Sequence, residues 1–235
     1  MLKFLGKGNA FDVDFGNTSA FYKDDKKLIL FDCGEDVFKK IVQFKLLENV
    51  KLVYVFITHL HSDHIGSLGT LIAYINFVYS KKLKLKIIYP DIERLTQLLE
   101  LMCIKKNQIS IYNCKDILKE IPCFEVKQEH VDGSYGYIIK IQDKTVFYSG
   151  DTSVINTQAL NMLQIGEIDY FYHEVSLFKT TLHTSVDELN RAIPKEFRER
   201  VYCMHLDNEA EQKVIQLGFK PVELYLKKSE KVVKK

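Results

Sequence analysis

All seven histidines of this 235-residue chain fall in segments that could contribute to one metal-dependent hydrolytic site. Three of them crowd into the motif His59-Leu60-His61-Ser62-Asp63-His64, directly after an apolar run that ends at Ile57. Side chains two apart in an extended segment project to the same side, so His59 and His61 can share one cation. Asp63 and His64 come after the chain turns and can reach a second cation. Imidazole and carboxylate groups suit Zn²⁺, and Mn²⁺ or iron can use the same atoms. The motif therefore predicts two divalent metal ions, with Zn²⁺ expected and Mn²⁺ as the alternative.

One loop cannot complete two coordination spheres, so further ligands must come from other parts of the chain. The candidates each follow a predicted strand: His130 after Phe124–Gln128, Asp151 after Lys144–Tyr148, and His205 after Val201–Met204. Taken alone, each candidate is more simply explained as a polar loop or turn residue. Because all three follow strands in the same way, the joint pattern favours the metal interpretation.

These residues must be positioned by a chain that alternates short β-rich runs with amphipathic segments. The β-rich runs predict strands at Lys3–Leu5, Thr18–Tyr22, Leu28–Phe31, Leu52–Ile57, Leu85–Tyr89, Phe124–Gln128, Tyr135–Ile141, Lys144–Tyr148, Tyr170–His173 and Val201–Met204. The amphipathic segments predict helices near 35–47, 67–80, 91–102, 156–163, 185–193 and 208–217, the last capped by Asn208 and closed by Gly218. Strands outnumber helices in both halves, so we expect an α/β (α+β) chain with two β-layers between helices.

Length and charge limit the classes of function. We expect a single domain over residues 1–226, followed by a basic C-terminal tail at 227–235. A net charge of +2 gives no strong argument for binding nucleic acid or a membrane. The five cysteines form no C-x-x-C pair, and the opening residues contain no long apolar stretch. The most apolar segment, Leu68–Tyr79, is shorter than the roughly 20 residues of a spanning helix. We therefore expect a cytoplasmic protein.

With these motifs the chain resembles the metallo-β-lactamase superfamily, which has an αββα sandwich fold and a two-metal site. The resemblance covers nearly the whole chain. It implies that His59, His61 and His130 hold one ion, that Asp63, His64 and His205 hold the other, and that Asp151 bridges them. It also implies that Asp32, in Phe31-Asp32-Cys33-Gly34, braces the metal loop.

A second constellation narrows the class of hydrolase. His173-Glu174-Val175-Ser176 ends a predicted strand, and Leu182-His183-Thr184-Ser185 follows shortly after it, an arrangement similar to loops of the ribonuclease Z branch. The resemblance implies that Glu174 positions His183 beside the scissile phosphate. We expect His183 to stabilise the phosphoryl charge or protonate the leaving oxygen, and Asp63 to accept a proton from the attacking water. The alternative for His183 is a residue that only precedes a helix, and for His173 we favour a packing role.

The chain departs from ribonuclease Z between His130 and Asp151. The twenty residues 131–150 are mostly used by two predicted strands, so the long arm with which that family grips tRNA has no room here. The anti-Pycsar proteins of phages, and related bacterial enzymes, are similar to ribonuclease Z without the arm. Their glycine-rich start resembles Gly6-Lys7-Gly8-Asn9-Ala10-Phe11 and Gly16-Asn17-Thr18-Ser19-Ala20-Phe21.

This resemblance implies a dinuclear metal phosphodiesterase that opens cyclic nucleotides to nucleoside monophosphates and counters cyclic-nucleotide immune signalling, in the host cytoplasm if a phage encodes it. Three alternatives stay open: tRNA 3′-processing or another RNA cleavage, hydrolysis of a lactone or thioester, and metal or nucleotide binding without catalysis. Because Leu68–Tyr79 is apolar on more than one face, we also expect a homodimer.

Overall fold

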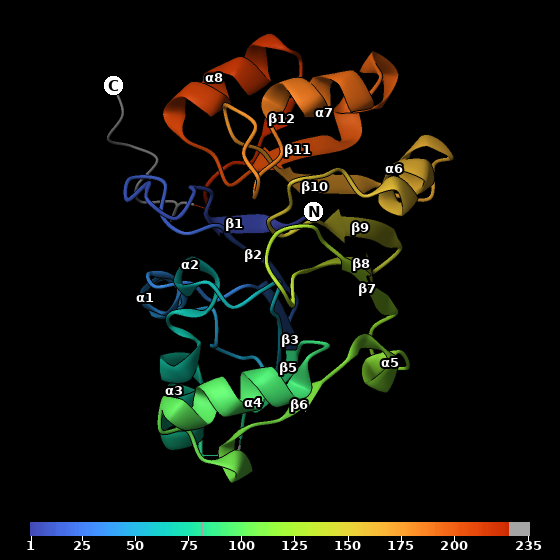
Figure 1. The fold of residues 1–235 in the computed structure, drawn as a ribbon. Helices are drawn as coiled ribbons and strands as arrows, with labels where there is room; N and C mark the ends of the chain where they lie inside the picture. The colour runs from blue at the N-terminus through green and yellow to red at the C-terminus, as the bar shows by residue number, and fades with distance from the viewer. Residues whose placement is uncertain (81, 226–235) are drawn as a thin grey trace.

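Two six-stranded mixed β-sheets lie face to face, with helices on the outer face of each (Figure 1). The computed structural model describes residues 1–80 and 82–225, so the expected basic tail at 227–235 lies outside the described residues. The first sheet runs in the order β1 (Lys3–Gly6), β2 (Ser19–Lys23), β3 (Lys27–Phe31), β4 (Leu52–Phe56), β5 (Lys84–Ile88) and β6 (Ile111–Tyr112). The second runs in the order β12 (Lys220–Pro221), β11 (Val201–Met204), β10 (Tyr170–Glu174), β9 (Lys144–Tyr148), β8 (Tyr135–Ile141) and β7 (Cys123–Lys127).

The helices connect and cover these sheets. The first half contains α1 (Val37–Gln43), α2 (Ser62–Ile65), α3 (Leu68–Val78), α4 (Ile92–Leu101), the 3₁₀ turn η1 (Lys106–Gln108) and α5 (Cys114–Ile117). The second half contains α6 (Thr157–Gln164), α7 (Val186–Ala192), the 3₁₀ turn η2 (Lys195–Arg200) and α8 (Asn208–Gln216). No helix in residues 1–80 and 82–225 is both long and apolar enough to cross a bilayer.

Three layers of apolar side chains hold the sandwich together. Alternation along a strand sends successive side chains to opposite faces, as β4 illustrates. Val53 and Val55 pack outward against the helices of the first half, whereas Tyr54 and Phe56 pack inward between the two sheets. A third layer joins the second sheet to α6, α7 and α8. The αββα architecture expected from the sequence is therefore confirmed.

All the predicted strands and helices are present, with small differences at their ends. Strands β6 and β12, which are two residues long, and the single-turn helices α2 and α5 were not predicted from the sequence. The predicted cap of α8 was wrong by one residue. Asp207, not Asn208, has the extended backbone, and its side chain accepts a hydrogen bond from the Ala210 amide at 2.8 Å.

The strand order brings several carboxyl-terminal strand ends to one edge of the sandwich. In the second sheet β9, β10 and β11 are parallel, and β7 has the same direction because it is separated from β9 by the antiparallel β8. In the first sheet β3 and β4 are parallel. The polar residues that follow these strands can therefore meet between the sheets.

Candidate metal centre

The loop after β4 is held in place by a buried carboxylate. Asp32, which follows β3 with a positive φ of 60°, accepts hydrogen bonds from the Thr58 amide at 2.8 Å and the Thr58 hydroxyl at 2.9 Å. Its Oδ2 also lies 2.9 Å from Nδ1 of His64. When Nδ1 of His64 donates this bond, its Nε2 keeps a free lone pair that faces the site. This geometry agrees with the bracing role expected of Asp32.

The first cluster of donor atoms consists of three imidazoles. Nδ1 of His61 lies 3.0 Å from Nε2 of His59 and 3.2 Å from Nε2 of His130. Tetrahedral Zn²⁺ with ligands at about 2.0 Å separates neighbouring donor atoms by about 3.3 Å. Burial lowers the pKa of His59 well below its ordinary value, so its ring is neutral. The three nitrogens therefore have the spacing that suits a shared cation.

The second cluster combines two imidazoles with two carboxylates. Nε2 of His64 lies 3.2 Å from Oδ2 of Asp63 and 3.4 Å from Oδ2 of Asp151. Nε2 of His205 lies 3.6 Å from the Asp63 oxygen and 3.3 Å from the Asp151 oxygen. His205 follows β11 with a positive φ of 61°, and its contacts with the two carboxylates place its side chain in this cluster.

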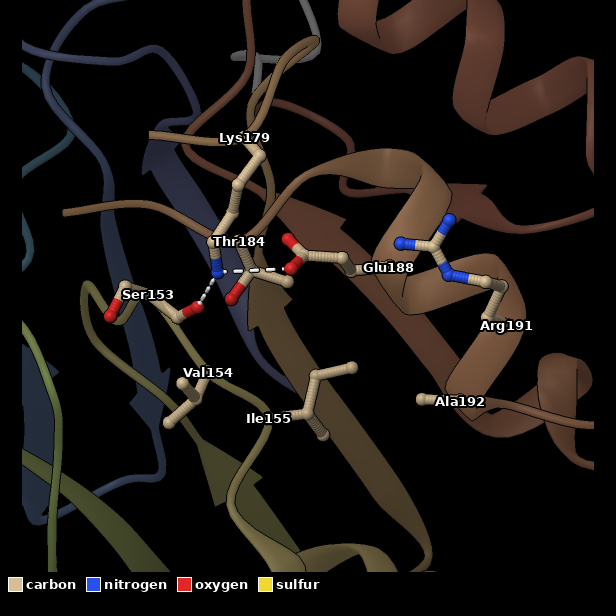
Figure 2. A pocket seen from close by; sticks show the side chains of 8 residues that line it. All are labelled: Ser153, Val154, Ile155, Lys179, Thr184, Glu188, Arg191 and Ala192. Atoms are coloured by element: carbon tan, nitrogen blue, oxygen red, sulfur yellow. Dashed lines mark hydrogen bonds and ion pairs between the residues drawn. The ribbon is translucent and has the colours of Figure 1, made fainter. Parts of the chain in front are cut away.

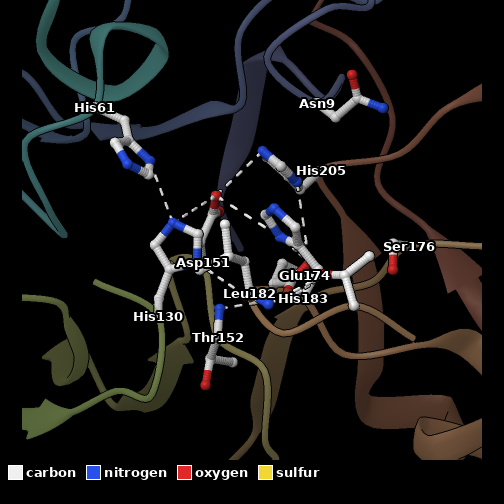
Figure 3. A network of polar contacts seen from close by, with 12 residues as sticks. Asn9, His61, His130, Asp151, Thr152, Glu174, Ser176, Leu182, His183 and His205 are labelled. Atoms are coloured by element: carbon white, nitrogen blue, oxygen red, sulfur yellow. Dashed lines mark hydrogen bonds and ion pairs between the residues drawn. The ribbon is translucent and has the colours of Figure 1, made fainter. Parts of the chain in front are cut away.

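Asp151 reaches both clusters with a single oxygen atom (Figure 3). The same Oδ2 that faces His64 and His205 lies 3.9 Å from Nε2 of His59 and 3.9 Å from Nε2 of His130. This oxygen is thus placed between the two donor sets, as a bridging ligand would be.

Unpartnered buried atoms provide a test of whether these residues fit metal ions. Among the described residues, Nε2 of His64 and Nε2 of His205 are buried without a hydrogen-bond partner. Within residues 1–80 and 82–225, the ion-pair partners of the buried Asp63 and Asp151 carboxylates are all histidines, with no lysine or arginine. Leaving such groups unpaired is costly. The donor set therefore fits two divalent cations, and the clusters bring together all seven expected ligands: His59, His61, Asp63, His64, His130, Asp151 and His205.

Glu174 and His183 lie beside the second cluster. Glu174 is fully buried at the end of β10, and its Oε1 accepts the amides of Thr152 at 3.2 Å and Thr184 at 3.0 Å. Its Oε2 lies 3.4 Å from Nδ1 of His183. Burial alone would lower the pKa of His183, but the Glu174 carboxylate outweighs it and raises that pKa. Nδ1 of His183 is also 4.0 Å from Oδ2 of Asp151, so its ring faces the oxygen that lies between the two clusters.

His173 stands apart from this arrangement. Its ring is buried beside Phe171, and its Nδ1 donates to the Glu174 carbonyl at 2.6 Å. The sequence did not predict that Thr58 would contact Asp32, or that Thr152 and Thr184 would contact Glu174. Thr58 could have been found from its place between a buried strand and His59, but backbone contacts leave no signal in a sequence.

Comparisons with known sequences find similar proteins that match most of the chain. A family model described as anti-Pycsar protein Apyc1 matches residues 1–223. The anti-Pycsar protein Apyc1 of Bacillus phage vB_BveM-Goe7 is 27% identical over 245 aligned residues, covering 92% of this chain and 93% of the phage protein.

Solved structures share the fold at low sequence identity. A diphosphatase of the PhnP family superposes with a TM-score of 0.75 and 18% identity, covering 96% of this chain and 95% of the other. The short form of human tRNase Z superposes with a TM-score of 0.69 and 17% identity, covering 96% and 97%. These neighbours show that the chain has the metallo-β-lactamase fold.

Proposed function

Because the chain belongs to the anti-Pycsar Apyc1 family, we propose that it is a metal-dependent phosphodiesterase that hydrolyses 3′,5′-cyclic nucleotides to nucleoside monophosphates. Family membership and the donor set support a metal-dependent hydrolase, and the cyclic-nucleotide substrate is the proposal. The observation that carries the proposed two-metal chemistry is the position of Oδ2 of Asp151. This oxygen lies between the two donor clusters and within 4.0 Å of His183.

In this proposal His59, His61 and His130 hold one ion, and Asp63, His64 and His205 hold the other, with Asp151 shared. Two bound ions would lower the pKa of water to give a nucleophile near neutral pH and would neutralise charge on the phosphoryl oxygens. Zn²⁺ is proposed for both positions, and Mn²⁺ is the alternative.

The residues beside the clusters would handle the protons of the reaction. The bond between phosphorus and one ribose oxygen breaks as a water oxygen attacks from the opposite side. Asp63 takes the proton of the attacking water, and His183 donates a proton to the departing ribose oxygen. Glu174 keeps His183 protonated and oriented, which its position 3.4 Å from Nδ1 of His183 supports.

The segment between His130 and Asp151 supports a small substrate. Residues 135–148 form the antiparallel pair β8 and β9, joined only by Gln142 and Asp143. A tRNA-gripping arm of the ribonuclease Z kind cannot extend from so tight a turn.

A phage relative supports action in a host cytoplasm against cyclic-nucleotide signalling. A homodimer also belongs to the proposal, and Phe77 and Val78 of α3 are exposed side chains that a partner could cover.

The test is a comparison of substrates with metal-loaded protein. Purine and pyrimidine 3′,5′-cyclic nucleotides, a precursor tRNA, a lactone and a thioester are each incubated with the wild type and with Asp151→Asn, and products are separated by chromatography. We expect nucleoside monophosphates from at least one cyclic nucleotide and none from Asp151→Asn. Turnover of the precursor tRNA, lactone or thioester alone would replace this assignment with another.

A further inference from the structure

The loop that carries His183, residues 176–184, is closed at its base by backbone hydrogen bonds. It joins β10 to α7, and the Ser176 amide donates to the Thr184 carbonyl at 2.9 Å. Near its tip the Thr180 hydroxyl accepts the amides of Leu182 at 3.1 Å and His183 at 2.9 Å. The position of His183 therefore depends on the position of this whole loop, which we call the His183 loop.

The His183 loop also contacts one of the proposed metal ligands. The Leu182 carbonyl lies 2.8 Å from Nδ1 of His130 (Figure 3). A carbonyl can only accept, so Nδ1 of His130 carries the proton and its Nε2 keeps the lone pair that faces His61. The backbone of this loop thus fixes the ring orientation and the tautomer of His130.

Lys179 connects the same loop to the segment after Asp151. Its Nζ donates to the Ser153 carbonyl and pairs with Oε1 of Glu188 at 3.0 Å (Figure 2). Ser153 in turn donates its amide at 2.6 Å and its hydroxyl at 2.8 Å to the carbonyl of Glu129, the residue before His130.

These contacts form a closed circuit of hydrogen bonds through three segments. It runs from Lys179 to Ser153, from Ser153 to Glu129, and from the adjacent His130 back to Leu182 of the His183 loop. The segments of Lys179, Ser153 and Glu129 also carry His183, Asp151 and His130, respectively. Breaking one of these hydrogen bonds should therefore change the positions of His130, Asp151 and His183 together.

We propose that Lys179 is a positioning residue that closes this circuit and so couples metal binding by His130 to the placement of His183. Lys179 itself touches neither the donor clusters nor a substrate in this proposal. The inference rests on the metal centre of the proposed function, but not on the identity of the substrate.

An ordinary surface ion pair is the competing explanation for Lys179. Its side chain is 44% exposed, and exposed pairs contribute little to stability. Lys144 offers a matched control, because its side chain is 45% exposed and its Nζ also lies 3.0 Å from a carboxylate, that of Asp169. Lys144 begins β9, at the end opposite Asp151, and so lies outside the circuit.

The experiment compares Lys179→Met, Lys179→Arg and Lys144→Met with the wild type. Affinity for Co²⁺ is measured by competition with a chromophoric chelator, and the visible absorption of bound Co²⁺ reports the geometry around the histidine ligands. We expect Lys179→Met to bind the weaker-held Co²⁺ about tenfold less tightly and to change its absorption, as the loss of a supporting contact does. Lys179→Arg should restore both properties, and Lys144→Met should match the wild type.

A second pair of readouts separates positioning from general stability and from the choice of substrate. On whichever phosphodiester the wild type cleaves, Lys179→Met should lower kcat about tenfold and leave KM nearly unchanged. Thermal unfolding of the metal-free proteins should be the same for Lys179→Met and Lys144→Met. Equal Co²⁺ affinity and absorption in Lys179→Met and the wild type would overturn the proposal. So would a loss of metal-free stability that Lys179→Arg fails to restore. If no phosphodiester is cleaved, the Co²⁺ measurements still decide the question.

Discussion

Two histidines outside the donor clusters, His183 and His173, differ in what surrounds their rings. The side chain of His183 is 23% exposed and faces both Glu174 and Asp151. The ring of His173 is buried, has no partner for its Nε2 among the described residues, and stacks beside Phe171. The first environment suits proton transfer at the mouth of the site, and the second suits a neutral packing residue.

Replacing His183 should remove catalysis without removing the metal. We expect His183→Ala to lower kcat for phosphodiester hydrolysis by about 10²- to 10⁴-fold, the usual contribution of a positioned general acid. Its metal content should equal that of the wild type, because no proposed ligand is lost. Steady-state kinetics and elemental analysis of the same samples make the comparison. A variant that keeps its full rate would show that His183 only precedes α7.

His173 should make stability depend on pH. Burial lowers the pKa of His173 from 6.5 to about 4 in the folded chain. The unfolded chain therefore binds a proton between these values that the folded chain does not. The stability contributed by neutral His173 is complete above about pH 6.5 and is lost as the pH falls toward 4. Between pH 7 and pH 5 the loss should be about 2 kcal/mol.

His173→Asn is the matched variant for this prediction, because its amide can still donate to the Glu174 carbonyl but does not titrate. Denaturant unfolding of both metal-free proteins at pH 7 and pH 5 measures the difference. The free energy of unfolding of the wild type should fall further than that of the variant. An equal decrease in the two proteins would contradict the assignment.

The sequence predicted the donor residues because their chemistry is in their side chains and they follow buried strands. His59, His61, Asp63 and His64 form a dense motif, and the more distant members of the donor clusters were predicted from their places after strands. Leu182 could not be found in this way, because it acts through a backbone carbonyl that every residue has. Lys179 was also missed, since one lysine among 33 basic residues gives no local signal of its partner.

At the scale of elements, the turn after β9 must pass very close to the metal loop. Gly150 has a φ of 61°, and a Cβ built there would lie 2.6 Å from Cβ of Thr58. Thr58 donates to Asp32, which in turn orients His64. A side chain at position 150 would therefore disturb the support of a proposed ligand.

Gly150→Ala should destabilise the protein by several kcal/mol and weaken metal binding. Left-handed backbone costs a residue with a Cβ about 1–2 kcal/mol, and the clash adds about 1–3 kcal/mol. Gly166→Ala is the control, because Gly166 also has a positive φ, of 87°, but an added Cβ would meet nothing within 4 Å. Denaturant unfolding and chelator competition should separate the two variants. Equal losses would mean that contact with Thr58 is unimportant.

Long elements were predictable because apolar periodicity accumulates over many residues, as in α4 (Ile92–Leu101), where Leu95 and Leu99 are buried. The two-residue strands β6 and β12 have no period of their own and exist only because they pair with β5 and β11. Asp207 and Asn208 are both good caps, so sequence alone could not choose between them.

At the scale of the whole molecule, the donor clusters join the two sheets. His59, His61, Asp63 and His64 follow β4 of the first sheet, whereas His130, Asp151 and His205 follow strands of the second. Between the sheets lies the inner apolar layer that includes Phe31, Phe56 and Tyr148. Ions bound at the edge of this layer would act as cross-links between the halves of the fold.

Chelation should therefore lower thermal stability markedly. A ligand present at 1,000 times its Kd stabilises the folded state by about 4 kcal/mol per site. We expect the Tm to fall on removal of metal and to recover when Zn²⁺ or Mn²⁺ is added. Asp151→Asn, measured in the same way by calorimetry, should recover less. A Tm that does not respond to metal would mean that the ions do not link the sheets.

Elemental analysis of the dialysed protein tests the two-metal account most directly. The account predicts two equivalents of divalent metal, Zn²⁺ or Mn²⁺, per chain in the wild type and a clear decrease in His205→Ala. A wild-type protein that retains no divalent metal after loading, or no more than the His205→Ala variant, would contradict it.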